Sequence, residues 1–407
     1  MRKSINILVA SINKFTYQNV EVFEVQFTFK SPTEIVFGSG SIKQIPEKVE
    51  EMASNHVFVV TDNGVKVAGI LGKVVKLLEE AKIQYTIFDK INKEPTIQLL
   101  EEALDELKKS GAQVVLGLGG GSSMDTAKAA AILVKNPGTV INYLKGKESF
   151  KNPGLPVIAV PTTAGTGSEL TRFAVFTGIE IKTKYSFGDY KIMAKYAILD
   201  PELTLTLPPK MTAGTGMDAL THAIESYVNY AAHPISEPMA MHAIKLVAKS
   251  LRKAVAKGDN LKAREDMLMA SALAAIAFSS TRVGIVHATS QPAGAHFSIP
   301  HGISNAIMLP YVMEYNLIGN PEKYIEIAIA FGEHVESLTP MEAAAKSVKA
   351  IRDLIRDIGI TERLSNYGVK ESDLDMLADE ALTSPNIPLN PRYPCKQDII
   401  EIYKKAL

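Results

Sequence analysis

The pattern of apolar residues changes near the middle of this 407-residue chain, and the change limits the folds open to it. Up to about residue 201, short runs of β-branched and aromatic residues alternate with amphipathic segments of helical period. After Pro208 and Pro209 only helical segments follow. The strand-like runs are residues 57–60, 85–88, 114–116, 157–160 and 196–199. Alternating strands and helices predict a parallel sheet covered by helices on both faces.

Helices are predicted between these strands and throughout the second half. They lie near residues 66–82, 96–110 and 123–135, and then at 238–257, 262–280, 340–358 and 373–382. We therefore predict an α/β domain over residues 1–205, of which residues 1–20 are an extension, and an all-helical domain over residues 206–407. In such an arrangement we expect the active site in the cleft between the domains.

The charges and the cysteine count narrow the classes of function. With 44 Lys and Arg against 44 Asp and Glu, the chain has no net charge, so it lacks the electrostatic footprint of a protein that binds nucleic acid or an anionic membrane. The single cysteine, Cys395, cannot form an internal disulfide, which fits a reducing compartment, and we expect a cytoplasmic protein.

No segment has the length of a membrane span. The longest clearly apolar helical stretch, residues 267–278, has 12 residues, whereas a spanning helix needs about 20. The apolar run at residues 5–12 resembles a signal peptide only faintly, because it contains Asn6 and Ser11 and no cleavage site follows. A dispensable extension or an extra edge strand is the favoured interpretation of this terminus.

A glycine-rich loop runs from a predicted strand into a predicted helix over residues 117–128. Its glycines allow backbone N–H groups to approach a pyrophosphate, and the helix N-terminus adds partial positive charge. The loop departs from the G-x-G-x-x-G pattern because Ser122 occupies the third glycine position. A plain tight turn would not need four glycines in five residues, so we interpret the loop as a phosphate-binding site.

Asp62 follows the strand-like run 57–60 and precedes Asn63 and Gly64. A carboxylate at this end of a strand can accept hydrogen bonds from the ribose hydroxyls of an adenosine. It would also repel a 2′-phosphate, by roughly 4 kcal/mol for unit charges about 4 Å apart at an effective dielectric of 20. From the residues alone, a solvated turn explains Asp62 equally well.

Acidic and histidine side chains in the second half suggest a metal site. Asp218 and His222 are four residues apart, which on a helix places both side chains on one face about 5–6 Å apart at Cβ. Residues 283–313 contain no Asp, Glu, Lys or Arg, yet they include His287, His296 and His301. Such histidines are either hydrogen-bonded core residues or metal ligands.

His301 stands between Pro300 and Gly302, where we expect it to be held at a turn, a common place for a ligand. One carboxylate and three imidazoles suit Fe²⁺ or Zn²⁺ and leave a position open for a substrate. His296, between Ala295 and Phe297, is interpreted as a core or cleft histidine.

In series, these motifs resemble the iron-containing (group III) alcohol dehydrogenases. The resemblance covers nearly the whole chain from about residue 21, and it rests on motifs that occur in order: residues 60–62, the glycine loop through Asp125 and Lys128, residues 161–169, residues 200–203, the Asp218/His222 segment and residues 300–306. It implies NAD(P)-dependent interconversion of small primary alcohols and aldehydes, with the metal activating the substrate oxygen.

The resemblance also implies roles for individual residues. The implied metal ligands are Asp218, His222, His287 and His301. The implied dinucleotide contacts are Asp62, Gly119, Gly120, Gly121, Ser122, Asp125, Thr162, Thr163, Thr166, Thr171 and Lys184. Members with Gly at the position of Asp62 tend to accept NADP, so the carboxylate favours NAD. Phe278 matches an aromatic residue of the substrate pocket, although a buried helix residue is an equal interpretation.

Two positions depart from the family pattern: Glu94 stands where an Asn is common, and the second departure follows His287. The family usually has a second His four residues after the ligand that corresponds to His287, and this chain has Gln291 there. An amide cannot act as a general base near neutral pH, so the proton exit route, and with it substrate choice, differs from the usual pattern.

We therefore predict a metal-dependent, NAD-linked alcohol dehydrogenase that acts on small molecules and forms a homodimer or a higher homo-oligomer. The alternatives are relatives with the same fold, either a glycerol or diol dehydrogenase or a lyase like dehydroquinate synthase. The lyase would need a basic pocket, which the charge-free stretch around His287 and His301 disfavours. A non-catalytic NAD sensor would leave the four ligand positions unexplained.

Overall fold

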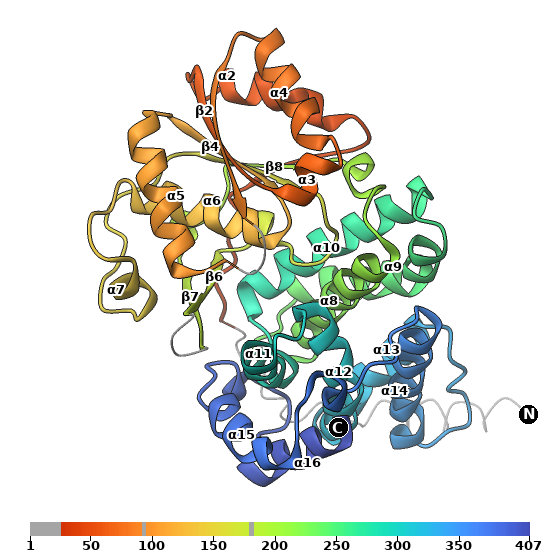
Figure 1. The fold of residues 1–407 in the computed structure, drawn as a ribbon. Coiled ribbons are helices and arrows are strands. Elements are labelled where there is room, and N and C mark those ends of the chain that lie inside the picture. Colours follow the sequence, from red (N-terminus) through yellow and green to blue (C-terminus); the bar gives the residue numbers. More distant parts are fainter. Residues whose placement is uncertain (1–25, 92–94, 179–182) are drawn as a thin grey trace, which may run out of the picture.

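The computed structural model describes residues 26–91, 95–178 and 183–407, which form two layers of different character joined at a central cavity (Figure 1). The predicted extension over residues 1–20 lies outside the described residues. In the view of Figure 1 the α/β half lies at the top and the helical half below it, with the long helix α10 between them.

The first half contains a six-stranded, wholly parallel sheet in the order β1-β8-β5-β4-β2-β3. Its strands are β1 (Glu34–Phe37), β2 (His56–Asp62), β3 (Gln84–Ile91), β4 (Val114–Gly119), β5 (Val157–Pro161) and β8 (Tyr196–Leu199). All five predicted strand runs lie inside these strands. In this sheet only β1 was not predicted, because this edge strand is largely exposed and lacks the continuous apolar run of the buried strands.

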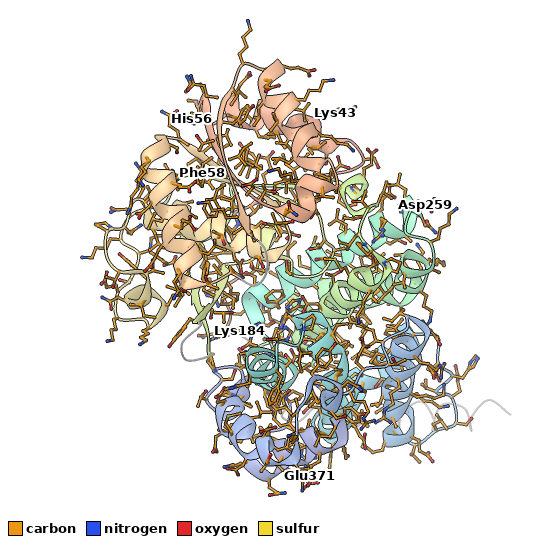
Figure 2. All side chains as sticks on the ribbon, viewed as in Figure 1. Lys43, His56, Phe58, Lys184, Asp259 and Glu371 are labelled. Atoms are coloured by element: carbon orange, nitrogen blue, oxygen red, sulfur yellow. The ribbon has the colours of Figure 1, made fainter. Side chains whose placement is uncertain are left out.

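Helices cover both faces of this sheet, as predicted. They are α2 (Ile45–Glu50), α3 (Asn63–Val67), α4 (Ile70–Glu80), α5 (Ile97–Ser110), α6 (Gly121–Leu133) and α7 (Val140–Leu144). The alternation of β2 shows the two layers: Phe58 and Val60 pack with α5 and α6, whereas Val57 and Val59 pack on the opposite face with α2 and α4. In Figure 2, Phe58 lies within the packed interior of this half.

The predicted helix over 66–82 is divided in the structure. Gly69 has a left-handed φ of 75° and separates α3 from α4. A left-handed residue interrupts the helical hydrogen-bond ladder, and glycine adopts it without a steric penalty. The apolar periodicity continues across this break, which explains why the sequence pattern predicts a single helix.

After β8 the described chain is helical, which confirms the predicted second fold class. The helices are α8 (Pro209–Val228), α9 (Ser236–Ala256), α10 (Leu261–Thr281), α11 (Ile285–Phe297), α12 (His301–Asn316), α13 (Pro321–Ala330), α14 (Pro340–Asp357), α15 (Leu374–Leu382) and α16 (Lys396–Ala406). One large apolar core joins them. No single helix of the described residues is long and apolar enough to cross a membrane; α10 and α11 reach that length and composition only as a pair bent by 102°.

A second, two-stranded sheet was not predicted. Strands β6 (Phe173–Gly178) and β7 (Thr183–Gly188) pair antiparallel between β5 and β8 in the chain. The hairpin sits at the lower edge of the α/β half, beside α11 (Figure 1). Its position matters because residues of both strands line the central cavity.

Candidate active site

The glycine loop begins at the end of β4 and continues into the first turn of α6. At Gly119, which has a φ of +150°, an added Cβ would lie 2.6 Å from Ser123 Oγ and 2.7 Å from Asp62 Oδ2. At Gly121 an added Cβ would lie 2.9 Å from the Thr166 methyl group. Side chains are therefore excluded here by close packing, which leaves backbone N–H groups as the surface of the loop.

Asp62 lies beside this loop, at the C-terminal end of β2. Its Oδ1 accepts a hydrogen bond from Val65 N at 3.0 Å and caps α3, and its Oδ2 accepts one from Ser123 Oγ at 3.3 Å. The sequence pattern could not distinguish a solvated turn from a cofactor contact. The structure brings Asp62 and the glycine loop together at the edge of the sheet where parallel strands bind ligands.

A second loop packs against the first. Thr162 N donates a hydrogen bond of 2.9 Å to Gly119 O, and the position of a Cβ on Gly120 would be 3.7 Å from the Thr163 side chain. Thr166 lines the cavity together with Gly121 and Ser122. Of the predicted dinucleotide contacts in this loop, Thr166 lines the cavity, and Thr162 and Thr163 pack against the glycine loop.

Asp125, also predicted as a cofactor contact, is held by protein donors. Its carboxylate accepts hydrogen bonds from Ser168 Oγ at 2.5 Å and from Val175 N at 3.0 Å. The fully buried Lys128 ammonium lies 3.3 Å from Asp125 Oδ1 and donates to the carbonyl oxygens of Ser168 and Phe173 at 2.8 and 2.5 Å. The pair therefore fixes the chain segment that leads from the 3₁₀ turn Ser168–Leu170 into β6.

Thr171, another predicted contact, belongs to the same segment. Its side chain is buried, and its Oγ1 lies 3.5 Å from both Ser168 O and Lys128 Nζ. Burial lowers the pKa of Lys128, and the Asp125 carboxylate opposes this shift because it favours the ammonium form. The sequence pattern places Lys128 in the glycine-loop motif but indicates no role for it.

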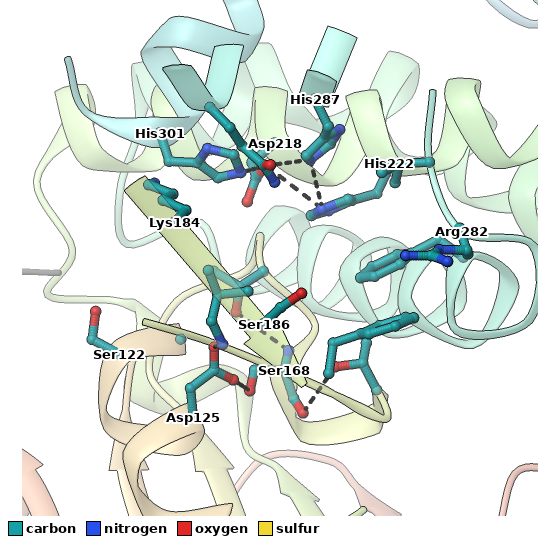
Figure 3. Close-up of a pocket in the computed structure, with 18 of the residues that line it drawn as sticks. Ser122, Asp125, Ser168, Lys184, Ser186, Asp218, His222, Arg282, His287 and His301 are labelled. Carbon is teal, nitrogen blue, oxygen red and sulfur yellow. Dashed lines mark hydrogen bonds and ion pairs between the residues drawn. The ribbon is translucent and has the colours of Figure 1, made fainter. Parts of the chain in front are cut away.

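The candidate metal ligands converge from three helices, α8, α11 and α12 (Figure 3). The Nε2 atoms of His222 and His287 are 3.0 Å apart, and Asp218 Oδ1 lies 3.8 Å from the first and 3.9 Å from the second. His301 Nε2 lies 3.5 Å from Asp218 Oδ1. The predicted i,i+4 relation between Asp218 and His222 is present on α8.

Two of these spacings, 3.0 Å and 3.5 Å, match those of neighbouring ligands around a divalent transition metal, and the other two, 3.8 Å and 3.9 Å, are somewhat longer. Metal–nitrogen bonds of about 2.0–2.1 Å place neighbouring ligand atoms about 3.0 to 3.5 Å apart in tetrahedral or octahedral geometry. The three atoms of Asp218, His222 and His287 lie within 4.8 Å of one another, all on buried residues. Two buried ring nitrogens and a carboxylate oxygen at these distances can all bind one cation, and the cation would neutralise the negative charge of the carboxylate.

A buried carboxylate fixes the orientation of one of these rings. Glu225 Oε2 lies 2.5 Å from His287 Nδ1, and Glu225 Oε1 accepts a hydrogen bond from Val286 N at 2.6 Å. With the proton of the ring on Nδ1, the lone pair of Nε2 faces the other candidate ligands. A carboxylate–histidine pair of this kind orients a metal-binding imidazole and raises its basicity.

Asn305 contacts the same cluster. Its Nδ2 donates to Asp218 Oδ1 at 2.8 Å and lies 3.3 Å from the Nε2 atoms of His287 and His301. Its Oδ1 accepts a hydrogen bond from Ser290 Oγ. Asn305 therefore holds the Asp218 carboxylate in place through a direct hydrogen bond.

Desolvation keeps two of the imidazoles neutral. It lowers the pKa of His222 to about 4 and that of His301 to about 3, and it outweighs the opposing attraction of the Asp218 carboxylate. Neutral imidazole is the form in which histidine binds a metal ion, so the rings are in the binding form throughout the physiological range.

One cavity of about 280 Å³ connects the metal-ligand candidates with the glycine loop. Phe278, Gln291 and Lys184 line it, as do residues of both halves of the chain, so the predicted location between the domains is correct. The ring of Phe278 stacks on His222 with centroids 4.2 Å apart. His301, predicted at a turn, is the first residue of α12 with Pro300 before it. His296 lies away from the cluster and forms a 2.8 Å contact with Glu380.

The sequence pattern did not indicate two residues that contact the metal-ligand candidates, Glu225 and Asn305. Glu225 follows His222 by three positions and Asn305 follows His301 by four, so each shares a helix face with a predicted ligand. This spacing could have identified both residues, because a polar residue on the same helix face as a predicted ligand is placed to hydrogen-bond to the metal ligands.

Comparison with known proteins supports these observations. Residues 32–201 match the family of iron-containing alcohol dehydrogenases, and residues 212–407 match the C-terminal region of the same family. The chain is 39% identical to 1,3-propanediol dehydrogenase of Klebsiella pneumoniae over 382 residues, which covers 93% of this chain and 98% of that protein. It is 37% identical to NAD-dependent methanol dehydrogenase of Bacillus methanolicus over 379 residues, with 93% and 99% covered.

Solved structures give the same result. The crystal structure of a 1,3-propanediol oxidoreductase superposes with a TM-score of 0.91 at 38% identity and covers 94% of this chain and 100% of that one. An alcohol dehydrogenase from Oenococcus oeni superposes with a TM-score of 0.90 at 38% identity, with 94% and 100% covered.

Proposed function

The chain belongs to the iron-containing alcohol dehydrogenase family, and from this premise we propose that it interconverts small primary alcohols and aldehydes with NAD at a divalent-metal site. The observation that carries the proposal is the cavity that joins the glycine loop to the cluster of Asp218, His222 and His287. A hydride acceptor and a metal-activated alcohol need to meet in one enclosed space, and this cavity provides it.

The proposal assigns the two halves different tasks. Residues 1–205 would bind the dinucleotide, with the pyrophosphate at the N-terminus of α6 and the ribose at Asp62. Residues 206–407 would hold the metal. The proposed ligands are Asp218, His222, His287 and His301. When bound, the metal supplies a Lewis acid for the substrate oxygen and NAD supplies the hydride acceptor.

The remaining residues position these groups. Glu225 keeps the His287 ring in the tautomer that presents Nε2, and Asn305 holds the Asp218 carboxylate. Phe278 forms an apolar wall against His222, which keeps water from the reacting carbon. Gln291 lines the cavity and can donate or accept a hydrogen bond, but its amide does not take up a proton at neutral pH. The proton released by the alcohol therefore leaves through water or a ribose hydroxyl.

We propose Fe²⁺ as the metal, with Zn²⁺ or another divalent ion as a substitute. Imidazole and carboxylate ligands suit each of these ions. Because the affinity of such a site follows the Irving–Williams order, affinity alone does not identify the metal bound in the cell. Metal analysis of protein purified without chelators and without oxygen would identify the ion.

We further propose a cytoplasmic homo-oligomer. The single cysteine and the absence of net charge fit the location. For the oligomer, support comes from β1, an edge strand of the described sheet on which Ile35 is 39% exposed and Phe37 is 38% exposed. An apolar edge of this kind is usually covered by another chain or protected.

The alternative of a diol dehydrogenase stays within the same family, because one relative is named for 1,3-propanediol. A second hydroxyl would need only one additional polar contact in the cavity. The lyase alternative is less well supported, because the relatives described above are named as dehydrogenases or an oxidoreductase.

Removal of the metal provides the first test. Protein treated with EDTA and desalted is expected to lose NADH formation from 1-propanol, and to regain it with Fe²⁺ under anaerobic conditions or with Zn²⁺. Mg²⁺ is the matched control, because it prefers oxygen ligands in octahedral geometry and should not restore activity. Turnover that persists in protein shown by elemental analysis to be free of metal would contradict the proposal.

The role of Asp62 is tested by Asp62→Ser, which keeps an acceptor for the cap of α3 and removes the negative charge. Repulsion of a 2′-phosphate amounts to about 4 kcal/mol at an effective dielectric of 20 and about 1 kcal/mol in water. Asp62 is half-buried, so we expect the ratio of kcat/KM for NADP over NAD to rise on the order of ten- to a hundredfold. An unchanged ratio, measured at physiological salt, would remove Asp62 from the cofactor site.

A further inference from the structure

Arg282 has a backbone conformation that arginine rarely adopts. Helix α10 ends at Thr281, and Arg282 follows with a φ of +65° and a ψ of −166°. Its N–H still donates to Phe278 O at 2.7 Å. This region of φ and ψ is essentially reserved for glycine, and other residues found there concentrate at ligand-binding sites. The position therefore keeps a large cationic side chain where glycine would remove the strain.

The guanidinium of Arg282 lines the cavity without an acidic partner. Among the residues that the structure describes, no carboxylate lies within ion-pair distance of it, and its side chain lies over the Phe173 ring, 6.0 Å from Cζ to the centroid. Burial and the nearby cation of Arg172 both lower the pKa of Arg282. A half-buried cation that faces a second cation is a poor structural element but a suitable receptor for an anion.

Arg282 lies away from the phosphate end of the cavity. In Figure 3, Ser122 at the start of α6 and Arg282 lie on opposite sides of the pocket, with Ser186 between them. Phe278 stacks on His222 and lies 6.5 Å from Phe173, centroid to centroid. The rings of Phe278 and Phe173 form an apolar wall that leads from the metal-ligand candidates toward Arg282. An alkyl chain is the group that fits beside such a wall.

We infer that the enzyme prefers alcohols and aldehydes that carry an anionic group, a carboxylate or a sulfonate, at the end remote from the reacting carbon, with Arg282 as its receptor. The inference rests on the proposed function and names its substrate class. The planar guanidinium can pair with two oxygens of such a group at once. In the oxidation, a hydride leaves the carbinol carbon for NAD⁺ and the hydroxyl proton leaves for solvent, so that an ω-hydroxy acid gives the ω-oxo acid, NADH and H⁺.

The test compares substrates of equal length. With NADH and metal-loaded protein, kcat/KM for 4-oxobutanoate is expected to exceed that for butanal by at least about tenfold, the size typical of a hydrogen-bonded ion pair. The three-carbon aldehyde that carries a terminal sulfonate is compared with 4-oxobutanoate, and the ratio of their kcat/KM values shows whether Arg282 prefers a sulfonate or a carboxylate. A cationic alcohol such as choline is expected to be the poorest substrate, because the cavity cation repels it.

Two variants assign the preference to Arg282. Arg282→Gly, which also relieves the backbone, is expected to lower the ratio of kcat/KM for 4-oxobutanoate over butanal at least about tenfold. Arg252→Gln removes a cation from the helical half, where Arg252 pairs with Asp357, and it should leave the ratio as it is. As a readout independent of turnover, 4-hydroxybutanoate should raise the Tm of the unsubstituted protein in the presence of NAD⁺ more than 1-butanol does. Arg282→Gly should abolish that difference.

The outcomes separate this inference from the function on which it depends. If neither aldehyde oxidises NADH, the proposed function fails. If butanal is reduced as efficiently as 4-oxobutanoate, or if Arg282→Gly keeps the anion preference, the function stands and the inference is overturned. Because glycine fits the conformation at this position, Arg282→Gly should unfold at the same or a higher temperature, so loss of fold does not confuse the result.

Discussion

His222→Ala is expected to bind its metal at least a hundredfold more weakly and to lose alcohol oxidation on the order of a thousandfold. His222 Nε2 is one of three buried ligand atoms that lie within 4.8 Å of one another. A metal that stabilises the transition state by several kcal/mol accounts for such a loss, since each 1.4 kcal/mol corresponds to a factor of ten. The measurements are metal content by elemental analysis, the Kd for Zn²⁺ by competition with a chromogenic chelator, and kcat/KM.

His296→Ala is the matched control. His296 belongs to the same charge-free stretch as His287 and His301, but its ring contacts Glu380 and not the cluster. It should keep both metal and activity. To separate loss of metal from loss of fold, His222→Asn retains a polar side chain in the same space. A His222→Ala protein that kept its metal and oxidised alcohols at the original rate would contradict the assignment of this ligand.

The fold could be predicted from the sequence wherever periodicity is long enough. The strand runs 57–60 and 114–116 lie in central strands buried on both faces, so nearly every residue is apolar and the pattern is unambiguous. The hairpin of β6 and β7 was not predicted, because its residues alternate between the cavity and the core and so do not alternate clearly between polar and apolar. Val175 and Thr177 line the cavity, whereas Ala174 and Phe176 are buried in the core.

The candidate site shows a similar division. Asp218 and His222 were predicted together because four residues on a helix fix their relative positions. The meeting of α8 with α11 and α12 is a tertiary arrangement that no local pattern encodes, so the pairing of His287 with Glu225 emerges only from the structure. Arg282 was missed for a different reason. Its significance lies in a φ of +65°, and an arginine after a helix gives no sign of it in the sequence.

Gly302→Ala is expected to have a large effect on stability, because α8 and α12 are in close contact at this position. A Cβ at Gly302 would lie 2.1 Å from Gly214 O and 2.6 Å from Gly214 C, well inside contact distance. Alanine favours a helix by about 1 kcal/mol over glycine, but that gain is smaller than the penalty for forcing two backbones apart, about 1–3 kcal/mol and occasionally more. The clash therefore outweighs the gain in helix propensity, and we expect Gly302→Ala to lower the free energy of unfolding.

The same displacement should weaken the metal site, because Gly302 follows His301 and Gly214 precedes Asp218 by one helical turn. Any separation of the two helices lengthens the 3.5 Å distance between His301 Nε2 and Asp218 Oδ1. We expect Gly302→Ala to lower both the urea midpoint and the affinity for Zn²⁺. Gly72→Ala is the control, since Gly72 lies within α4 with no atom within 4 Å of an added Cβ. It should stabilise the protein by about 0.5–1 kcal/mol and leave metal binding unchanged. If both variants behaved alike, helix propensity and not the contact with Gly214 would govern position 302.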